Sequence, residues 1–292
     1  MTPVSRRTVV FGASGLLGRA LVRRFAAGAG AAVLTVPWAE AGPRARVASD
    51  EAFGSWLAER MGPGPCDVLL ACGLVDPAAP PGDLEFSNHL FPRRVMAAAW
   101  ELDAHRFLTF GTVHEAWDAA CEANAYFASK RRLGDWVQAA ARRPGAEGRL
   151  LHLRLHTLYG LPLHPRMFLG QMVAALRAGS PFAMSAGRQL REYHHADDLA
   201  EAVFRLCHMP QLPGPLLTLS SGRPLRLADL AREVFSAIGR SDLLRMGAIA
   251  AMEGDNTEQV FPATDPSIYP PGRDPVAGVV ATLRAALAEA GG

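Results

Sequence analysis

A tyrosine and a lysine four positions apart are the residues of this chain best suited to proton transfer. Tyr126 and Lys130 stand in the run Tyr-Phe-Ala-Ser-Lys, and this spacing places both side chains on one face of a helix. A free tyrosine titrates near pH ~10, and a neighbouring ammonium group favours the phenolate and lowers the pKa of the phenol. The pair therefore predicts a tyrosine that transfers a proton at neutral pH, although an ordinary surface pair has the same spacing.

A hydroxyl upstream of this pair would orient the oxygen that receives the proton. Thr112 lies fourteen positions before the tyrosine, and Gly111 marks the end of an apolar run that we expect to be a strand. Side chains alternate across a strand, so Thr109 shares a face with Gly111 and is the competing candidate. We favour Thr112, whose structural alternative is a threonine bonded to its own turn. His114 and Glu115 follow directly and either reach a substrate or lie on a surface loop.

A glycine-rich turn near the N-terminus offers a site for phosphate groups. The apolar run that ends at Gly12 predicts a buried strand, and Gly15 and Gly18 follow at three-residue steps into a helical pattern. Free N–H groups at the start of such a helix favour a pyrophosphate, although glycines also occur where a helix and a strand merely pack closely. We expect a dinucleotide here, bound by Gly12, Ser14, Gly15, Leu16, Leu17 and Gly18, and by Ala71, Cys72 and Gly73 where the third strand ends.

The segment after the second expected strand, 31–36, bears on which dinucleotide binds. Folds of this kind that bind NAD usually carry an acidic residue there, which holds the ribose hydroxyls. This chain has Pro37 and Trp38 instead, with Arg44 and Arg46 a little further on. We lean towards NADP with Arg44 as a ligand of the 2′-phosphate. The alternatives are a solvated arginine-bearing loop and NAD as the cofactor.

Strands and helices alternate along the chain, which predicts a parallel sheet covered on both faces. Periodicity and turn residues place strands at 31–36, 67–72, 105–110, 149–155 and 216–219, and helices at 16–27, 50–60, 85–102, 126–141, 167–178, 196–207, 227–238 and 275–290. We expect an α/β fold of the Rossmann type, with a doubly wound parallel sheet and a smaller C-terminal α/β lobe that binds substrate. The dinucleotide-binding domain would be 1–160, to which 191–209 returns, and the lobe would be 161–190 with 210–292.

The composition is that of an ordinary globular protein of 292 residues with a net charge of +2. Its arginines are scattered, so no basic stripe favours nucleic acid. The four cysteines show neither the paired spacing of a zinc site nor the density of a secreted disulfide scaffold. No apolar run is long enough to span a membrane, and no cleavable leader is evident. We therefore expect a cytoplasmic protein that has no metal site and binds neither nucleic acid nor membranes.

Several runs of this chain occur together in one known family. They are the glycines at 12, 15 and 18, Thr112, Tyr126-x-x-x-Lys130 and the run Arg191-Glu-Tyr-His-His-Ala-Asp-Asp-Leu. Asn88, the run 153–160 and Leu219-Ser-Ser-Gly-Arg223 also fall where that family has similar segments. In this combination the chain resembles the extended short-chain dehydrogenase/reductase family, which comprises nucleotide-sugar epimerases, dehydratases and 4-ketoreductases. The resemblance covers most of the chain.

The resemblance implies that a Rossmann domain binds NAD(P) and that the C-terminal lobe binds a nucleoside-diphosphate sugar. Arg191 would contact the phosphates of that substrate, a role that suits a guanidinium group. His114 and Arg223 would supply further substrate contacts. The family also implies a homodimer formed through the helices at about 85–102 and 124–141.

The activity that we expect is reduction of a nucleotide-linked 4-keto sugar. A hydride would pass to the carbonyl carbon, Tyr126 would donate the proton, Thr112 would orient the oxygen, and Lys130 would lower the pKa of the tyrosine and hold the nicotinamide ribose. The runner-up is an epimerase with tightly bound NAD, and a less favoured alternative is a non-catalytic dinucleotide sensor. Val113 and His114 stand where the dehydratases of this family carry Asp-Glu, so we rank a dehydratase low.

Overall fold

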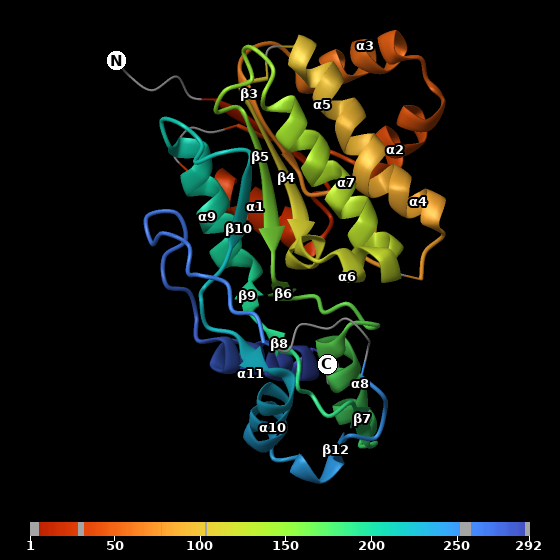
Figure 1. The fold of residues 1–292 in the computed structure, drawn as a ribbon, viewed down its shortest axis with the longest axis vertical. Helices are drawn as coiled ribbons and strands as arrows, with labels where there is room; N and C mark the ends of the chain where they lie inside the picture. Colours follow the sequence, from red (N-terminus) through yellow and green to blue (C-terminus); the bar gives the residue numbers. More distant parts are fainter. Residues whose placement is uncertain (1–5, 29–31, 77, 103, 252–257, 290–292) are drawn as a thin grey trace. The chain divides into compact units, whose positions relative to one another are not determined.

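The computed structural model divides the chain into two units (Figure 1). It describes residues 6–28, 32–76, 78–102, 104–251 and 258–289. The first unit holds the chain up to Leu155 and takes it up again at Ala200–Leu219. The second unit comprises His156–Leu199 and the chain from Ser220 onwards.

A parallel sheet forms the centre of the first unit, in the order β10-β5-β4-β3-β1-β2. Its strands are β1 (Arg7–Phe11), β2 (Val33–Val36), β3 (Cys66–Leu70), β4 (Arg106–Thr112), β5 (Leu150–Leu155) and β10 (Leu216–Leu219). The strand order reverses between β1 and β3, and doubly wound sheets bind their ligands at such a switch point, beside the carboxyl ends of the strands. The predicted doubly wound, Rossmann-type α/β fold is confirmed.

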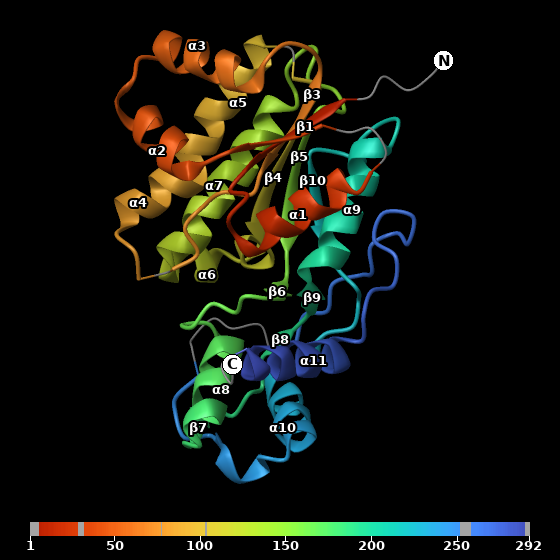
Figure 2. The ribbon, with the colours of Figure 1, turned by 180° about the vertical axis from the view of Figure 1, so that it is seen from behind.

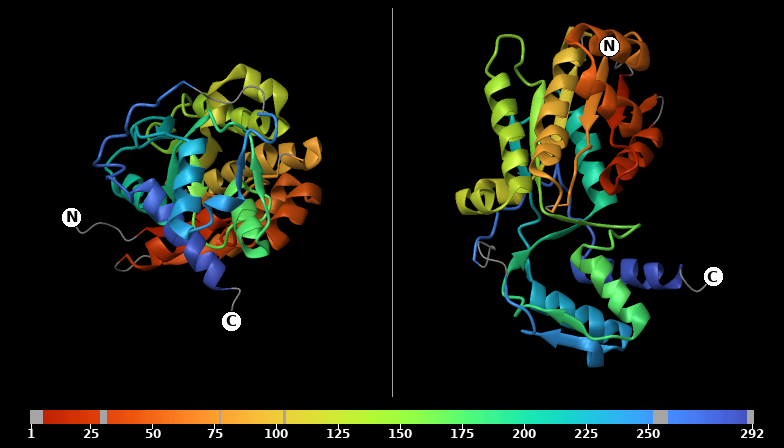
Figure 3. Two further views of the ribbon diagram at one scale, coloured as in Figure 1. Left: turned by 90° about the horizontal axis from the view of Figure 1, so that it is seen from below. Right: turned by 90° about the vertical axis from the view of Figure 1, so that its right-hand side faces the viewer.

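Helices cover both faces of this sheet. α1 (Leu16–Ala26) and the part of α9 (Ala196–His208) that belongs to this unit lie on one face (Figure 2). α5 (Phe91–Glu101) and α7 (Ala125–Ala140) lie on the other face, and Figure 3 shows α1 and α7 on opposite sides of the strands. Buried side chains of β1, β3 and β4 pack against α5, α7 and α3 (Asp50–Met61), with Phe11, Phe53 and Phe107 wholly or almost wholly enclosed. This layered core fixes the positions of the strand ends.

Three helical segments differ from the expected ones, and one of them, α6 (Asp118–Ala123), was not predicted at all. The stretch after β2, expected as an arginine-bearing loop, forms the helix α2 (Trp38–Val47), which begins directly after Pro37. The expected helix 85–102 starts earlier, as α4 (Pro81–Glu85), and continues through the π-helical turn η1 (Phe86–Leu90) into α5. The π turn inserts an extra residue and leaves Asn88 fully buried. Such turns are frequent at functional sites.

The remaining predicted strands and helices are present in the described part of the chain, and their ends differ by at most two residues. Short strands were missed because two or three residues carry no periodic signal. All of the missed strands lie in the second unit. They pair as β6 (Thr157–Tyr159) with β9 (Tyr193–His195), β7 (Phe182–Met184) with β12 (Leu244–Met246), and β8 (Leu190–Arg191) with β11 (Leu225–Arg226).

The core of the second unit is formed by its helices α8 (Phe168–Ala178), α10 (Leu227–Ile238) and α11 (Pro275–Ala288). The division of the chain corrects the expected boundaries at three places. Residues 156–160, expected in the dinucleotide-binding domain, belong to the second unit. Residues 191–199 belong to the second unit, and only the chain from Ala200 returns to the first. Residues 210–219, expected in the substrate lobe, belong to the first unit because β10 pairs with β5 at the edge of the main sheet.

Candidate active site

The turn between β1 and α1 has no room for side chains at two of its glycines. Gly12 has a φ of +83°, and a Cβ there would lie 2.6 Å from the carbonyl carbon and oxygen of Ala71. A Cβ at Gly18 would lie 2.7 Å from the carbonyl carbon of Gly12, so α1 packs directly against the turn. Gly15 is the N-cap of α1 and has no side chain to bond the first N–H groups. Ser14 and Gly15 are exposed. The turn fits the pyrophosphate of a dinucleotide.

The segment after β3 forms a second small space, over Gly73. This glycine has a φ of +150°, and a Cβ there would meet the Asn88 Oδ1 and would lie 3.0 Å from the Lys130 Nζ. Asn88 Nδ2 donates to the Leu74 carbonyl at 3.0 Å and to the Ser129 Oγ at 3.1 Å. Its Oδ1 is buried and has no hydrogen-bond partner among the described residues. An ammonium group and an unsatisfied carbonyl oxygen over a bare glycine fit the hydroxyl groups of a ribose.

Ala71 and Cys72 connect β3 to this space. Ala71 is half-buried and its backbone contacts the glycine turn, whereas Cys72 is buried. Burial raises the pKa of the Cys72 thiol to about 12. The thiol is therefore uncharged at neutral pH.

Lys130 reaches the carboxyl end of β4 from α7. Its Nζ donates to the Phe110 carbonyl at 3.0 Å, and burial lowers the pKa of its ammonium group. Tyr126 lies one helical turn earlier, where burial and, after it, the charge of Glu115 raise the pKa of the phenol. The charge of Lys130 is not among the causes that shift the pKa of Tyr126, so the expected lowering of that pKa by Lys130 is not seen in this structure. The phenol keeps its proton at neutral pH.

The two candidate threonines have different surroundings. Thr109 is fully buried, and its Oγ1 is 2.7 Å from the Nδ1 of His152 on β5. Thr112 is the last residue of β4 and the N-cap of the short helix η2 (Val113–Ala116), with its Oγ1 3.0 Å from the His114 Nδ1. Only Thr112 therefore lies at the edge where a substrate could approach. The structure gives the preference for Thr112 a physical reason.

His114 and Glu115 do not share one environment. The His114 ring stacks on Phe127 of α7, with centroids 4.5 Å apart, and stays half-exposed. The Glu115 side chain is fully buried, so its expected place on a surface loop or at the substrate was wrong. Its Oε1 accepts the Thr112 N–H at 2.6 Å, and its Oε2 lies 3.0 Å from the His152 Nε2.

The sequence analysis did not identify His152 as a residue of the site, although Gly111 and Gly134 indicate that a side chain packs closely against them. A Cβ at Gly111 would collide with the Glu115 carboxylate and the His152 ring. On α7, a Cβ at Gly134 would lie 3.0 Å from the His152 Cδ2. A glycine in a strand and one in a helix are both locally unfavourable, so each marks a close approach from another element.

Arg44 lies away from the end of β2. It is on α2, six residues after Trp38, which is about 9 Å along a helix axis. Its guanidinium is exposed and lies 5.3 Å from the centroid of the Trp56 ring on α3. Its expected role as a 2′-phosphate ligand has no support here, because the chain after β2 is a helix that carries it away from the switch point.

The expected substrate residues of the second unit lie on neighbouring segments. Arg191 is half-buried in β8, which pairs with β11 so that Arg191 lies opposite Leu225. Arg223 is exposed, two positions before Leu225. Glu192 accepts the N–H and the hydroxyl of Ser221 at 2.6 and 2.7 Å and thereby fixes the turn that precedes Arg223. The two arginines thus lie on neighbouring segments of this unit, Arg191 in β8 and Arg223 just before β11.

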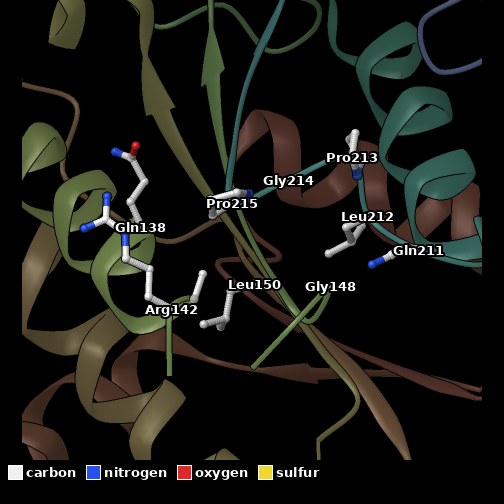
Figure 4. Close-up of a pocket in the computed structure, with 10 residues that line it drawn as sticks. Gln138, Arg142, Gly148, Leu150, Gln211, Leu212, Pro213, Gly214 and Pro215 are labelled. Carbon is white, nitrogen blue, oxygen red and sulfur yellow. The ribbon is translucent and has the colours of Figure 1, made fainter. Parts of the chain in front are cut away.

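A cavity of about 690 Å³ opens at the opposite edge of the main sheet (Figure 4). Leu150 begins β5 and Pro215 precedes β10, so this cavity lies at the amino ends of the strands. Gln138 and Arg142 of α7 lie on one side of it, and Leu212 lies on the other. Arg142 is the one charged residue among its lining residues. We do not assign the chemistry to this cavity, because the candidate residues gather at the carboxyl ends.

Within the described ranges, no group of three or more His, Cys, Asp or Glu side chains is arranged so that it could bind a metal ion. No helix in those ranges is both long and apolar enough to cross a membrane.

Comparison with known proteins identifies relatives of this arrangement. The model of the family described as "NAD dependent epimerase/dehydratase family" matches residues 8–215. The chain is 27% identical over 121 residues to a probable UDP-glucuronate 4-epimerase from Rhizobium meliloti (strain 1021), and the match spans 35% of each chain.

Solved structures resemble the chain over nearly its whole length. A UDP-glucose 4-epimerase from Thermotoga maritima with UDP-glucose has a TM-score of 0.80 and 14% identity, and the match covers 98% of this chain and 100% of that one. MoeE5 in complex with UDP-glucose and NAD has a TM-score of 0.78 and 18% identity over 98% and 100% of the two chains. DesIV, a dTDP-glucose 4,6-dehydratase from Streptomyces venezuelae with NAD bound, has a TM-score of 0.76 and 19% identity, and the match covers 95% of this chain and 96% of that one. At sequence identities this low, the similarity to these solved structures shows a shared fold.

Proposed function

Because the chain belongs to the NAD dependent epimerase/dehydratase family, we propose that it is an NAD-dependent oxidoreductase that reduces the 4-keto group of a nucleoside-diphosphate sugar. The observation that carries this proposal is the placement of Tyr126 and Lys130 on one face of α7, where the Lys130 Nζ donates to the Phe110 carbonyl near the carboxyl end of β4. A phenol at this place is protonated at neutral pH and can give its proton to a substrate oxygen.

The proposed reaction divides the work among four side chains. NADH, when bound, supplies the hydride for the carbonyl carbon. Tyr126 gives its proton to the oxygen as negative charge develops there, and Thr112 donates a hydrogen bond that orients the same oxygen. Lys130 would hold the ribose together with Asn88 over Gly73.

We propose NAD rather than NADP as the cofactor. The expectation of NADP rested on Arg44, which lies on α2 against Trp56. The family is NAD-dependent, and structural neighbours of this chain were solved with NAD. A comparison of NADH with NADPH at equal concentrations tests this choice, and a preference for NADPH would contradict it.

We propose that Arg191 and Arg223 bind the diphosphate of the substrate, with His114 contacting the sugar. The position of the two arginines on neighbouring segments of the second unit supports this assignment. Structural neighbours were solved with UDP-glucose, which carries such a diphosphate.

We also propose a homodimer formed through the helices near 85–102 and 124–141. The resemblance to the family implies this assembly, and Leu90 of η1, which lies in the first of these segments, is 44% exposed. Sedimentation velocity at several protein concentrations tests this assembly.

A second candidate function is an epimerase that oxidises and re-reduces the same carbon. The partial match to a probable UDP-glucuronate 4-epimerase favours it. A dehydratase has less support, because Val113 is buried and Glu115 is held in an internal network, which leaves no acid–base pair after Thr112.

One experiment separates these functions. The purified protein is first analysed for bound NAD, and is then given dTDP-4-keto-6-deoxyglucose with NADH or, separately, UDP-glucose and UDP-glucuronate without added cofactor. Stoichiometric NADH consumption supports the reductase, whereas sugar epimerisation without added cofactor supports the epimerase. Tyr126→Phe should lower either activity by about 10²–10⁴-fold, the usual contribution of a positioned acid or base. An unchanged rate would refute the role of Tyr126.

A further inference from the structure

A tryptophan lies beside the glycine turn, at the edge of the sheet where the candidate residues gather. Phe11 of β1 pairs with Val36 of β2, and these are the last residues of their strands. Gly12 and Pro37 therefore leave the sheet at the same level, from neighbouring strands that lie about 4.8 Å apart. Pro37 is the N-cap of α2, and Trp38 is its first residue. The indole is thus anchored next to the turn that fits the pyrophosphate of a dinucleotide.

Packing against η1, α5 and a glycine of α2 holds the indole in place. Its ring centroid lies 4.9 Å from that of Phe91, at an interplanar angle of 70°, and 6.2 Å from that of Phe86. A Cβ at Gly42 would lie 2.7 Å from the Trp38 Cε2, so this glycine keeps space for the ring although glycine is unfavourable inside a helix. Trp38 is nevertheless 37% exposed, whereas Phe91 is 1% exposed. The ring is therefore fixed by its neighbours and still has surface that a ligand can contact.

The residues around Trp38 do not supply the usual contact to a dinucleotide. Folds of this kind that bind NAD usually hold a ribose with an acidic residue after the second strand. Here Pro37 and Ala39 flank the tryptophan and have no polar side-chain atoms. Glu40 follows, but its carboxylate pairs with Arg60 of α3. This place therefore offers a nucleoside an aromatic ring instead of a carboxylate.

The order of the strands decides which half of the dinucleotide reaches Trp38. β1 lies between β2 and β3 in the sheet, and the turn after β1 fits the pyrophosphate. The space over Gly73, with Lys130 and Asn88, follows β3 and fits a ribose. The two nucleosides of a dinucleotide extend to opposite sides of its pyrophosphate, so the second nucleoside extends over β2. Since we assign the nicotinamide ribose to Lys130, the adenosine half lies beside Trp38.

The indole and the adenine ring are complementary in shape and polarity. Both are flat, and a base stacks on an aromatic side chain without a directed hydrogen bond. We propose that Trp38 is a cofactor-binding residue, whose indole stacks on the adenine of the dinucleotide. This inference rests on the proposed function, which requires a dinucleotide. The stack supplies apolar contact to the base where a carboxylate would bind the ribose hydroxyls.

Nucleotide binding tests this role without turnover. Nucleotide-free protein is titrated by calorimetry with NADH and with ADP-ribose, which carries the adenine and the pyrophosphate but no nicotinamide. Trp38→Ala removes the ring and should weaken the binding of both ligands by the same factor, about 5–100-fold, the range typical of a base stacked on an aromatic side chain. Trp38→Phe keeps an aromatic face and should restore most of the affinity. Circular dichroism verifies that each variant is folded.

Trp100→Ala is the matched control. Trp100 is also a tryptophan of the first unit, half-buried on α5, and its ring stacks on Phe107 with centroids 5.9 Å apart. Phe107 is the second residue of β4, so this ring lies near the amino end of that strand, away from the edge that carries the glycine turn. The variant should lose stability and bind NADH and ADP-ribose with the affinity of the wild-type protein.

A fluorescence measurement keeps the test decisive if Trp38→Ala fails to fold. ADP-ribose does not absorb the light that tryptophan emits, so it can quench the emission only through contact or a change of surroundings. Saturating ADP-ribose should quench part of the tryptophan emission of the wild-type protein and of Trp100→Ala. The same quench should be absent in Trp38→Phe.

Three results would decide against one of the two proposals. Equal affinities of the wild-type protein and Trp38→Ala for ADP-ribose, or a quench that persists in Trp38→Phe, would overturn the role of Trp38. A loss of affinity for NADH without a loss for ADP-ribose would place the ring against the nicotinamide half and would overturn it as well. A protein that shows the expected losses, yet reduces no sugar nucleotide, would refute the proposed function and leave the role of Trp38 standing.

Discussion

Gly111→Ala is a substitution for which the structure predicts a large loss of stability from one added carbon atom. The new Cβ would lie 2.7 Å from the Glu115 Cδ, about 1 Å inside ordinary carbon–carbon contact. The carboxyl group cannot yield without leaving the Thr112 N–H or His152, which hold it at 2.6 and 3.0 Å. Breaking a buried, charged pair costs about 3–5 kcal/mol, and the lower entropy of the unfolded alanine chain returns about 0.4–1 kcal/mol. We expect a net loss of about 3 kcal/mol.

Urea unfolding followed by tryptophan fluorescence measures this loss of stability in the first unit of the chain, which contains Gly111. All five tryptophans, at positions 38, 56, 100, 117 and 136, lie in the first unit. With an m-value of about 3 kcal/mol/M, the midpoint should fall by about 1 M urea.

A double-mutant cycle identifies the cause of the loss. When Glu115→Ala removes the carboxylate, the His152 ring still meets the new Cβ, so Gly111→Ala should destabilise this variant less than it destabilises the wild-type chain, and the two effects should be less than additive. Gly134→Ala is the control, because its Cβ would meet the His152 Cδ2 at 3.0 Å while alanine gains about 1 kcal/mol in a helix. A wild-type midpoint for Gly111→Ala, or strict additivity with Glu115→Ala, would refute the reasoning.

Two further predictions concern the second unit. Hydrogen bonds and charges from His194 and its neighbours outweigh burial and lower the pKa of Glu192 from 4.5 to about 2. The ionised Glu192 therefore adds about 2–3 kcal/mol to the free energy of unfolding above pH 4.5, and this stabilisation is lost as the pH falls towards 2. Glu192→Gln should flatten the acid unfolding curve measured by circular dichroism, and an unchanged slope would contradict this. The buried Tyr159 hydroxyl has no hydrogen-bond partner among the described residues, so Tyr159→Phe should leave the urea midpoint, followed by circular dichroism, unchanged or raise stability by about 1 kcal/mol. A loss above about 1 kcal/mol would indicate a bonded hydroxyl.

Local sequence patterns predicted most of the helices and strands of the fold. The helix from Leu16 and the helix from Leu227 begin at the predicted residue because their apolar spacing and flanking residues are read within a few turns of chain. The strand Leu216–Leu219 was also predicted, but its place in the main sheet was not. It pairs with β5, which lies more than sixty residues earlier in the chain, and a local pattern does not indicate such a pairing. The helix α2 was missed because Pro43 stands inside it and Pro37 precedes it.

Sequence alone also determined the chemical types at the candidate site. The spacing of Tyr126 and Lys130 and the three glycines of the turn are local, and a helix or turn fixes the geometry of such residues directly. Tertiary structure decided what surrounds them. Glu115 and His152 are thirty-seven residues apart and meet only because β4 and β5 pair. Charge, burial and pKa depend on these distant partners, so the state of the Tyr126 proton could be read only from the folded chain.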